Sequence, residues 1–177
     1  MKLLFLGPQG SGKSTQAKLL SGRLQIPVVS TGDIFRKISE DISEDGQRIA
    51  AIVRSGELVP DKEVSLIVEK RLKEEDCQNG FILDGYPRSV VQIEYFDPGF
   101  DKVIFLTISK QAAIDRLVKR GRFDDTPESI QTRLENYYRQ IEGITNYYWQ
   151  KGIVIEVNAE GSVEDIALEI CRQLGIE

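Results

Sequence analysis

The residues with the clearest chemistry lie near the amino terminus, in segment 7–14, whose sequence is GPQGSGKS. Its glycines allow backbone angles that other residues avoid, so successive N–H groups can converge on one anion. A helix that begins near Lys13 would bring its positive dipole end to the same place. Lys13 can reach the outer phosphates of a nucleoside triphosphate, and the Ser14 hydroxyl can ligate the accompanying Mg²⁺. The pattern predicts a phosphate-binding loop; the alternative is a glycine-rich turn that only joins a strand to a helix.

Arginine and aspartate gather in three later segments. In STGDIFR, Thr31 and Arg36 fall on one side of a starting helix, and in LDGYPR an apolar strand ends at Asp84 before a turn returns Arg88 over the sheet. Carboxylate oxygen is a ligand that Mg²⁺ prefers, which suits Asp84. Segment 116–125, RLVKRGRFDD, is a charge cluster around a glycine hinge. Each segment also has an alternative interpretation without a ligand. Arg36 could be a solvated surface charge, Asp84 could cap the following turn, and segment 116–125 could be a solvated loop.

Taken together, these segments favour phosphoryl transfer. The planar fork of arginine donates paired hydrogen bonds to phosphate and stays charged near neutral pH. Histidine is absent, and Cys77 and Cys171 form no C-x-x-C pair, so we expect no covalent enzyme intermediate. Direct attack by a substrate oxygen on a terminal phosphoryl group needs positioning and charge neutralisation. Lysine, arginines and Mg²⁺ supply both.

Short apolar strands alternate with longer amphipathic helices along the chain. Strands without polar alternation, separated by helices, predict a parallel sheet buried on both faces, with ligands at the carboxyl ends of its strands. The clearest helix is Pro127–Gln150, with Thr126 as its N-cap, and others begin at Asp61 and near Ser162. The predicted strands are Lys2–Leu6, 27–30, Phe81–Asp84, 103–108 and 153–157.

Composition limits the classes of protein that the chain can represent. Its 177 residues, 41% of them hydrophobic, suffice for one compact domain, and no Pro/Ser-rich linker divides it. A net charge of -5 argues against binding nucleic acid or anionic membranes through bulk electrostatics. The first apolar run is too short for a signal peptide or a membrane span, so we expect a cytoplasmic location.

Five motifs, in order, resemble those of adenylate kinases: GPQGSGKSTQ, STGDIFR, DGYPR with Gln92 following, RGRFDD and RLENYY. The resemblance covers essentially the whole chain. It implies interconversion of ATP plus AMP with two ADP, with Mg²⁺ as the cofactor carried by ATP. It also implies a P-loop three-layer α/β/α fold around a five-stranded parallel sheet, and a monomer. Residues 1–177 would form a single domain with a mobile monophosphate-binding segment, 30–59, and a short lid, 119–125.

The resemblance also implies a role for each matching residue. The catalytic charges would be Lys13, Arg36, Arg88, Arg120, Arg122 and Arg133. ATP would contact Gly10, Ser11, Gly12, Lys13, Ser14, Thr15, Arg120 and Gly161. AMP would contact Thr31, Arg36, Glu57, Leu58, Val59, Gly85, Tyr86, Pro87, Arg88, Gln92, Arg122 and Arg133, with 57–59 acting through main chain around the adenine. The Mg²⁺ held by ATP phosphates and water would lie near Ser14, Asp33 and Asp84.

Two positions bear on the choice of monophosphate. Family members that prefer UMP or CMP typically have SAGD where this chain has STGD at 30–33, and asparagine in place of Gln92. A purine needs a wider slot and a donor–acceptor pair at its edge, which the Gln92 amide can supply. Both positions favour AMP. Without the neighbouring motif, Gln92 would be interpreted as an ordinary exposed helix residue.

The chain departs from many bacterial relatives in its lid. Only three residues separate Arg120 from Asp124, so the long lid insertion is missing, and with it any four-cysteine metal lid. We therefore expect no zinc site. Two alternatives stay open: a kinase of another nucleoside monophosphate, such as UMP or CMP, and a catalytically silent nucleotide-binding module. The complete set of lysine and arginine positions disfavours the silent module.

Overall fold

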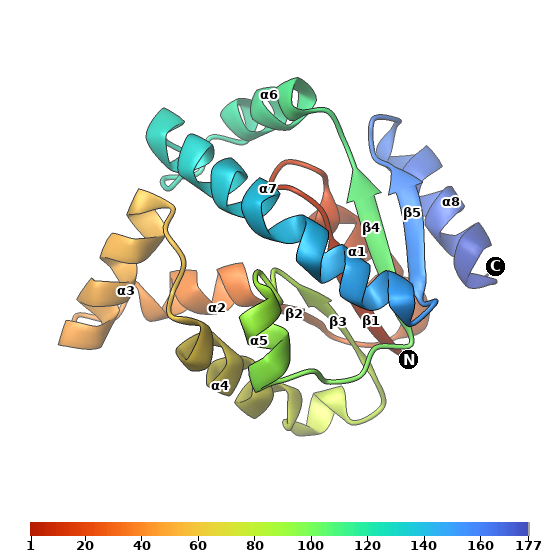
Figure 1. Cartoon of the computed structure of the whole chain (residues 1–177), viewed down its shortest axis with the longest axis horizontal. Helices are drawn as coiled ribbons and strands as arrows, with labels where there is room; N and C mark the ends of the chain where they lie inside the picture. Colours follow the sequence, from red (N-terminus) through yellow and green to blue (C-terminus); the bar gives the residue numbers. More distant parts are fainter. Residues whose placement is uncertain (177) are drawn as a thin grey trace.

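A five-stranded parallel sheet forms the centre of the computed structural model, which describes residues 1–176 (Figure 1). Its strand order is β2-β3-β1-β4-β5. All five predicted strands are present: the second begins one residue later than predicted, the fourth lies one residue earlier and the fifth one residue later. The strands are β1 (Lys2–Leu6), β2 (Val28–Ser30), β3 (Phe81–Asp84), β4 (Lys102–Thr107) and β5 (Val154–Asn158).

Helices cover both faces of this sheet. Because successive side chains of a strand point to opposite faces, Leu3 and Phe5 of β1 join one apolar cluster whereas Leu4 and Leu6 join another. The first cluster packs against α1 (Lys13–Leu24) and α8 (Val163–Leu174). The second packs against helices from the middle of the chain and α7 (Pro127–Gln150). The three-layer α/β/α prediction is therefore confirmed.

The middle of the chain forms a group of short helices beside the sheet, in orange to olive in Figure 1. Helix α7 crosses over the second face of the sheet with the limits that its sequence predicts. The Thr126 Oγ1 accepts a hydrogen bond from the Ser129 N–H at 3.2 Å, and the Ser129 Oγ accepts one from the Thr126 N–H at 3.1 Å. This reciprocal cap fixes where α7 begins. The remaining elements are α2 (Thr31–Ile38), α3 (Glu44–Ser55), α4 (Asp61–Leu72), a 3₁₀ turn (Glu75–Cys77), α5 (Val90–Tyr95), α6 (Lys110–Arg120) and α7 (Pro127–Gln150).

The strand order places a crevice above the central strand. The connection after β1 leads outward to β2, whereas the connection after β3 passes to β4 on the other side of β1. Ligands of open parallel sheets bind where the strand order reverses in this way. A small separate cluster of Leu117, Ile130 and Leu134 joins α6 to α7 beside that crevice. It anchors the short connection that carries the predicted lid.

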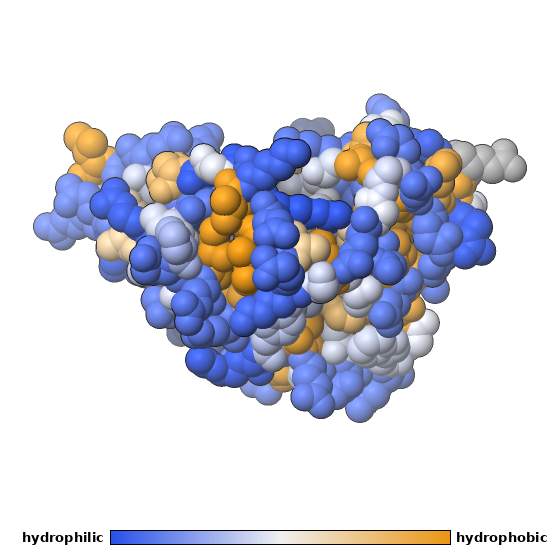
Figure 2. All heavy atoms as spheres, turned by 90° about the horizontal axis from the view of Figure 1, so that it is seen from above, coloured by the Kyte–Doolittle hydropathy of each residue, from blue (hydrophilic) through white to orange (hydrophobic). Residues whose placement is uncertain are grey.

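The face of the molecule shown in Figure 2 is mainly hydrophilic. On the face shown in Figure 2, a strip of hydrophobic residues near the middle interrupts a largely polar surface. Within residues 1–176, no helix has the length and apolar character needed to cross a membrane. Even α7, the longest, carries charged side chains along its length.

Candidate active site

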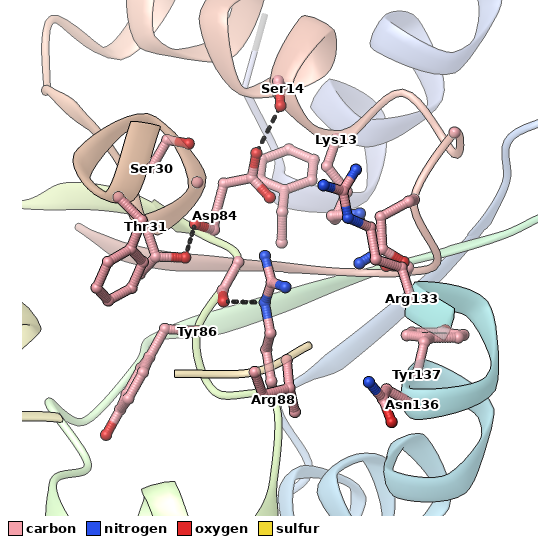
Figure 3. Close-up of a pocket in the computed structure, with 18 of the residues that line it drawn as sticks. Lys13, Ser14, Ser30, Thr31, Asp84, Tyr86, Arg88, Arg133, Asn136 and Tyr137 are labelled. Carbon is pink, nitrogen blue, oxygen red and sulfur yellow. Dashed lines mark hydrogen bonds between the residues drawn. The ribbon is translucent and has the colours of Figure 1, made fainter. Parts of the chain in front are cut away.

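A cavity of about 380 Å³ opens at the carboxyl ends of the strands (Figure 3). Its walls come from the loop after β1, the turn after β3, and helices α2, α3, α6 and α7. Segments far apart in the sequence therefore share one space. Nearly every residue predicted for the site lines it; the exceptions are Ser11, Asp33 and Gly161.

The loop after β1 adopts the predicted strand–loop–helix arrangement. Gly10 has φ +87°, and a Cβ there would lie 2.5 Å from the Ala113 carbonyl oxygen, so glycine is required. Helix α1 begins at Lys13 with no side-chain cap and no acidic residue in its first turn. In contrast, α6, α7 and α8 each begin with a serine or threonine side-chain cap. The first N–H groups of α1 are thus left for an anion.

Lys13 lies half-buried at the floor of the cavity. Its Nζ donates to the carbonyl oxygens of Gly7 and Pro8, at 2.8 and 2.9 Å. Burial lowers the pKa of Lys13 to about 8, against the attraction of Asp84 and with further repulsion from Arg88 and Arg120. A nearby anion would favour the charged form and raise this pKa. The lysine therefore has only neutral hydrogen-bond partners here, and a phosphate would stabilise its charged form more strongly.

Asp84 and Ser14 meet beside this lysine. The Ser14 Oγ donates to the Asp84 Oδ2 at 2.7 Å, and Asp84 is only 5% exposed (Figure 3). Residues 1–176 contain no group of three or more His, Cys, Asp or Glu side chains that could hold a metal ion alone. Mg²⁺, however, is usually bound through one or two carboxylates, water and substrate phosphates. One buried carboxylate with a hydroxyl beside a phosphate loop fits that mode.

Arg88 occupies the middle of the cavity. Its Nε donates to the Gly85 carbonyl at 2.9 Å, and its guanidinium points between Asp84 and Arg133 (Figure 3). Burial lowers the pKa of Arg88; Asp84 opposes the shift, and Arg133 and Arg36 add to it. Positive charges are thus crowded around this space. Such crowding is relieved by a bound anion.

Two aspartates orient the arginines at the edge of the lid. Arg120 donates two hydrogen bonds to the Asp125 carboxylate, at 2.8 and 2.6 Å. Arg133 donates to the Asp124 Oδ2 at 2.7 Å and to the Val53 carbonyl at 2.9 Å. The second contact joins α7 to α3 across the cavity. Burial lowers the pKa of Arg122, and repulsion by Arg120 and Arg36 adds to that effect.

Gln92 lies deep in the wall opposite the phosphate loop. It is 1% exposed, so its interpretation as an exposed helix residue is wrong. Its Oε1 accepts from the Arg88 N–H at 2.7 Å, and its Nε2 donates to the Asp61 Oδ1 at 2.8 Å. Nearby, the buried Tyr86 hydroxyl contacts the Gln92 and Phe96 carbonyl oxygens. These contacts fix the turn that follows β3.

Three predicted residues have different surroundings. The carboxylate of Asp33 pairs with Arg36 on the same helix, and its side chain is 66% exposed. Gly161 is exposed in the loop between β5 and α8, outside the cavity. Ser11 is 1% exposed and lies inside the phosphate loop rather than on its surface. The predicted contact of Gly161 with ATP stays a prediction.

The cavity is also lined by residues that belong to the quoted motifs but were assigned no role. Asn136 and Tyr137 follow Arg133 by about one turn of α7, and Arg116 precedes Arg120 by one turn of α6. Helical spacing from the predicted arginines could have found all three. The Asn136 Nδ2 is buried without a hydrogen-bond partner, as is the Gln9 Oε1. These two atoms retain unused hydrogen-bonding capacity at the cavity wall.

Comparison with known proteins gives a consistent result. A family model described as adenylate kinase matches residues 5–153. The adenylate kinase of Bifidobacterium longum is 40% identical over 98% of this chain and all of its own length. That of Leifsonia xyli subsp. xyli is 39% identical, covering 97% of this chain and 92% of its own. Adenylate kinase 1 of a Nostoc species is 39% identical over 98% of both chains.

Proposed function

The chain belongs to the adenylate kinase family, and from that premise we propose how its residues carry out the reaction. The enzyme catalyses reversible phosphoryl transfer between ATP and AMP, giving two ADP. Two phosphorylated ligands must therefore meet in one space. Each ligand is assigned to one side of the cavity.

ATP occupies the phosphate loop. The uncapped start of α1 and the loop from Gly10 to Thr15 bind its phosphates, and Lys13 leaves the Gly7 and Pro8 carbonyls to follow the charge as it moves. Arg120 reaches ATP from the lid. Ser14 and Asp84 would hold the Mg²⁺ of ATP through the phosphates and water, where the ion supplies neutralisation of phosphate charge.

AMP occupies the opposite side. Thr31 and Arg36 of α2, the segment 57–59 and the turn 85–88 surround it, with Gln92 at the edge of its base. Arg88 contacts the AMP phosphate. Arg122 and Arg133 extend from the lid side toward the same phosphate and the transferring group.

The transfer is a direct in-line displacement. An oxygen of the AMP phosphate attacks the γ-phosphorus of ATP, and the bond from that phosphorus to the β–γ bridging oxygen breaks, so that both products are ADP. No protein nucleophile is needed, since the transition state requires alignment and compensation of charge on the phosphoryl oxygens. Lys13 and the five arginines provide that compensation in a site that excludes water when segments 30–59 and 119–125 close.

One observation carries the proposal: seven cations from several elements line a single cavity, and burial and mutual repulsion lower the pKa values of Lys13, Arg88 and Arg122 there. This number of cations suits the phosphates of two nucleotides better than those of one. We also propose that the enzyme acts as a monomer in the cytoplasm.

The test is a coupled assay of phosphoryl transfer from ATP to AMP, UMP, CMP, GMP and dTMP, measured side by side. We expect AMP to have the highest kcat/KM by at least ~100-fold, because the base edge recognised by Gln92 is that of adenine. A preference for UMP or CMP would overturn the assignment of the acceptor. Absence of transfer to every monophosphate would identify a silent nucleotide-binding module.

A further inference from the structure

The side-chain amide of Gln92 is held from both sides by groups that cannot exchange roles. The Arg88 backbone N–H can only donate, and it meets the Gln92 Oε1 at 2.7 Å. The Asp61 carboxylate can only accept when ionised, and it meets the Gln92 Nε2 at 2.8 Å. The same Asp61 oxygen accepts from the Ser89 hydroxyl at 2.9 Å. One orientation of the amide satisfies all these contacts.

The reversed orientation would be costly. It would set the Nε2 donors against the Arg88 N–H and the Oε1 against the Asp61 carboxylate, leaving buried polar groups unpaired in a residue that is 1% exposed. In the observed orientation, one N–H of Nε2 and one lone pair of Oε1 remain free. The amide therefore offers a ligand one donor and one acceptor in a fixed order.

We propose that Asp61 is a specificity-determining positioning residue, which fixes the Gln92 amide so that it recognises a 6-aminopurine and rejects a 6-oxopurine. Adenine presents an acceptor at N1 and a donor at its 6-amino group, whereas hypoxanthine and guanine present a donor at N1 and an acceptor at O6. Reversal of the amide would reverse the preference. The inference rests on the proposed contact between Gln92 and the AMP base.

The position of Asp61 supports this role over a purely structural one. Asp61 begins α4, one residue beyond the segment 57–59 and after Pro60, and no side chain caps that helix. A negative charge in the first turn stabilises a helix, but Glu63 supplies one as well. Only the Asp61 carboxylate is turned toward Ser89 and Gln92. The neighbouring Glu63 instead pairs with Arg48, at 2.7 Å.

The decisive experiment compares AMP with IMP, which has nearly the same shape and the opposite hydrogen-bonding pattern. Asparagine in Asp61→Asn can donate to a reversed amide, so we expect the ratio of kcat/KM for AMP to that for IMP to fall about tenfold. The change should appear in the KM for the monophosphate and leave the KM for ATP unaltered. Glu63→Gln is the matched control, since it removes a charge from the same helical turn and should leave the ratio unchanged.

An unchanged ratio in a folded Asp61→Asn enzyme would overturn the inference. If that variant does not fold, Ser89→Ala, which removes a hydrogen bond to the same oxygen, should shift the ratio in the same direction by a smaller factor, and no shift would again overturn it. The variant Gln92→Leu distinguishes failure of the proposed base contact from failure of the proposed role of Asp61. If it leaves the KM for AMP unchanged, the proposed base contact is wrong; if it raises that KM while Asp61→Asn has no effect, only the role of Asp61 is wrong.

Discussion

At the scale of single residues, the site combines fixed and loosely held cations. Arg120 and Arg133 are fixed by the carboxylates of Asp125 and Asp124. Lys13 and Arg88, in contrast, contact only neutral carbonyl oxygens by hydrogen bond. A group with neutral partners loses little when it turns to a phosphate. These two residues are therefore the ones that we expect to respond most strongly to nucleotide binding.

Replacement of Arg88 should remove transition-state stabilisation without unfolding the protein. We expect Arg88→Ala to lower kcat/KM for AMP by about 10³-fold, because a cationic hydrogen-bond donor to phosphate at the centre of the site is lost. Arg172→Ala is the matched control, since the Arg172 side chain is 73% exposed and pairs only with Glu169 on the surface. Steady-state kinetics and urea denaturation should be measured on both variants. An Arg88→Ala enzyme with normal kcat/KM would remove the assigned role.

The pKa of Lys13 predicts that ATP binding takes up protons near pH 8. In the free enzyme its pKa is about 8, so the lysine is partly neutral at that pH; the phosphates of ATP favour its charged form and raise the pKa. Calorimetric titrations with Mg-ATP at pH 8, in buffers of different ionisation enthalpy, should show uptake of about half a proton per ATP. Well below pH 8 the lysine is charged in both the free and the ATP-bound enzyme, so the proton uptake that it causes should vanish.

The matched variant for this titration is Lys13→Arg, whose guanidinium stays charged throughout. We expect it to bind ATP without proton uptake at pH 8. If the variant and the unchanged enzyme take up equal numbers of protons on binding ATP, a group other than Lys13 binds them. No uptake by either would contradict the shifted pKa.

Most site residues could be predicted from the sequence because each belongs to a short ordered motif. Lys13 follows a glycine loop, and Arg88 follows a turn at the end of a strand. Asp61 could not be predicted in this way, since its hydrogen-bond partner Gln92 lies on a different helix and only the packing of α4 against α5 brings them together. The pairing of Asp33 with Arg36, in contrast, joins residues three apart on one helix and could have been predicted from their spacing.

At the scale of elements, two connections surround the cavity. Helix α6 ends at Arg120 and is capped by Gly121, which has φ +59°, and Thr126 caps the start of α7, so the predicted lid is a short loop between two well-defined ends. On the other side, α3 touches α7 through the Val53 carbonyl and Arg133. A movement of α3 away from α7 that admits AMP must break this hydrogen bond, unless the Arg133 side chain moves with α3.

We expect opening of the lid or release of product to limit turnover. Rapid-quench experiments with enzyme in excess over ATP should give a chemical step at least ~10-fold faster than kcat, because such movements often limit well-evolved enzymes. Added viscogen should lower kcat and leave the chemical step unchanged. A chemical step no faster than kcat would contradict the prediction.

Helices and strands were predicted correctly where the local sequence marks their ends. Thr126 and Pro127 give the start of α7 directly, and the apolar runs give the strands. Helix α3 was not predicted, although it contains the apolar run 49–53, and its apolar face packs against α2 and α7 rather than against the sheet. The surfaces of α2 and α7 that cover this helix cannot be recognised from the sequence of α3 alone.

At the scale of the whole molecule, an acidic protein carries a locally cationic cleft. The net charge is -5, yet seven cations line one cavity at the carboxyl ends of a parallel sheet. The fold resolves this contrast by bringing together arginines that are spread over about a hundred residues of sequence. The result is a space suited to two phosphorylated ligands at once. This supports transfer within a single ternary complex.

The stereochemistry of the transferred phosphorus tests this account most directly. ATP made chiral at its γ-phosphorus with oxygen isotopes should be incubated with AMP and the enzyme, and the configuration of the transferred group in the ADP formed from AMP should be determined. A single in-line transfer from ATP to AMP predicts inversion of configuration. Retention would require two successive displacements through a phosphorylated enzyme, and would contradict the two-nucleotide site proposed for this cavity.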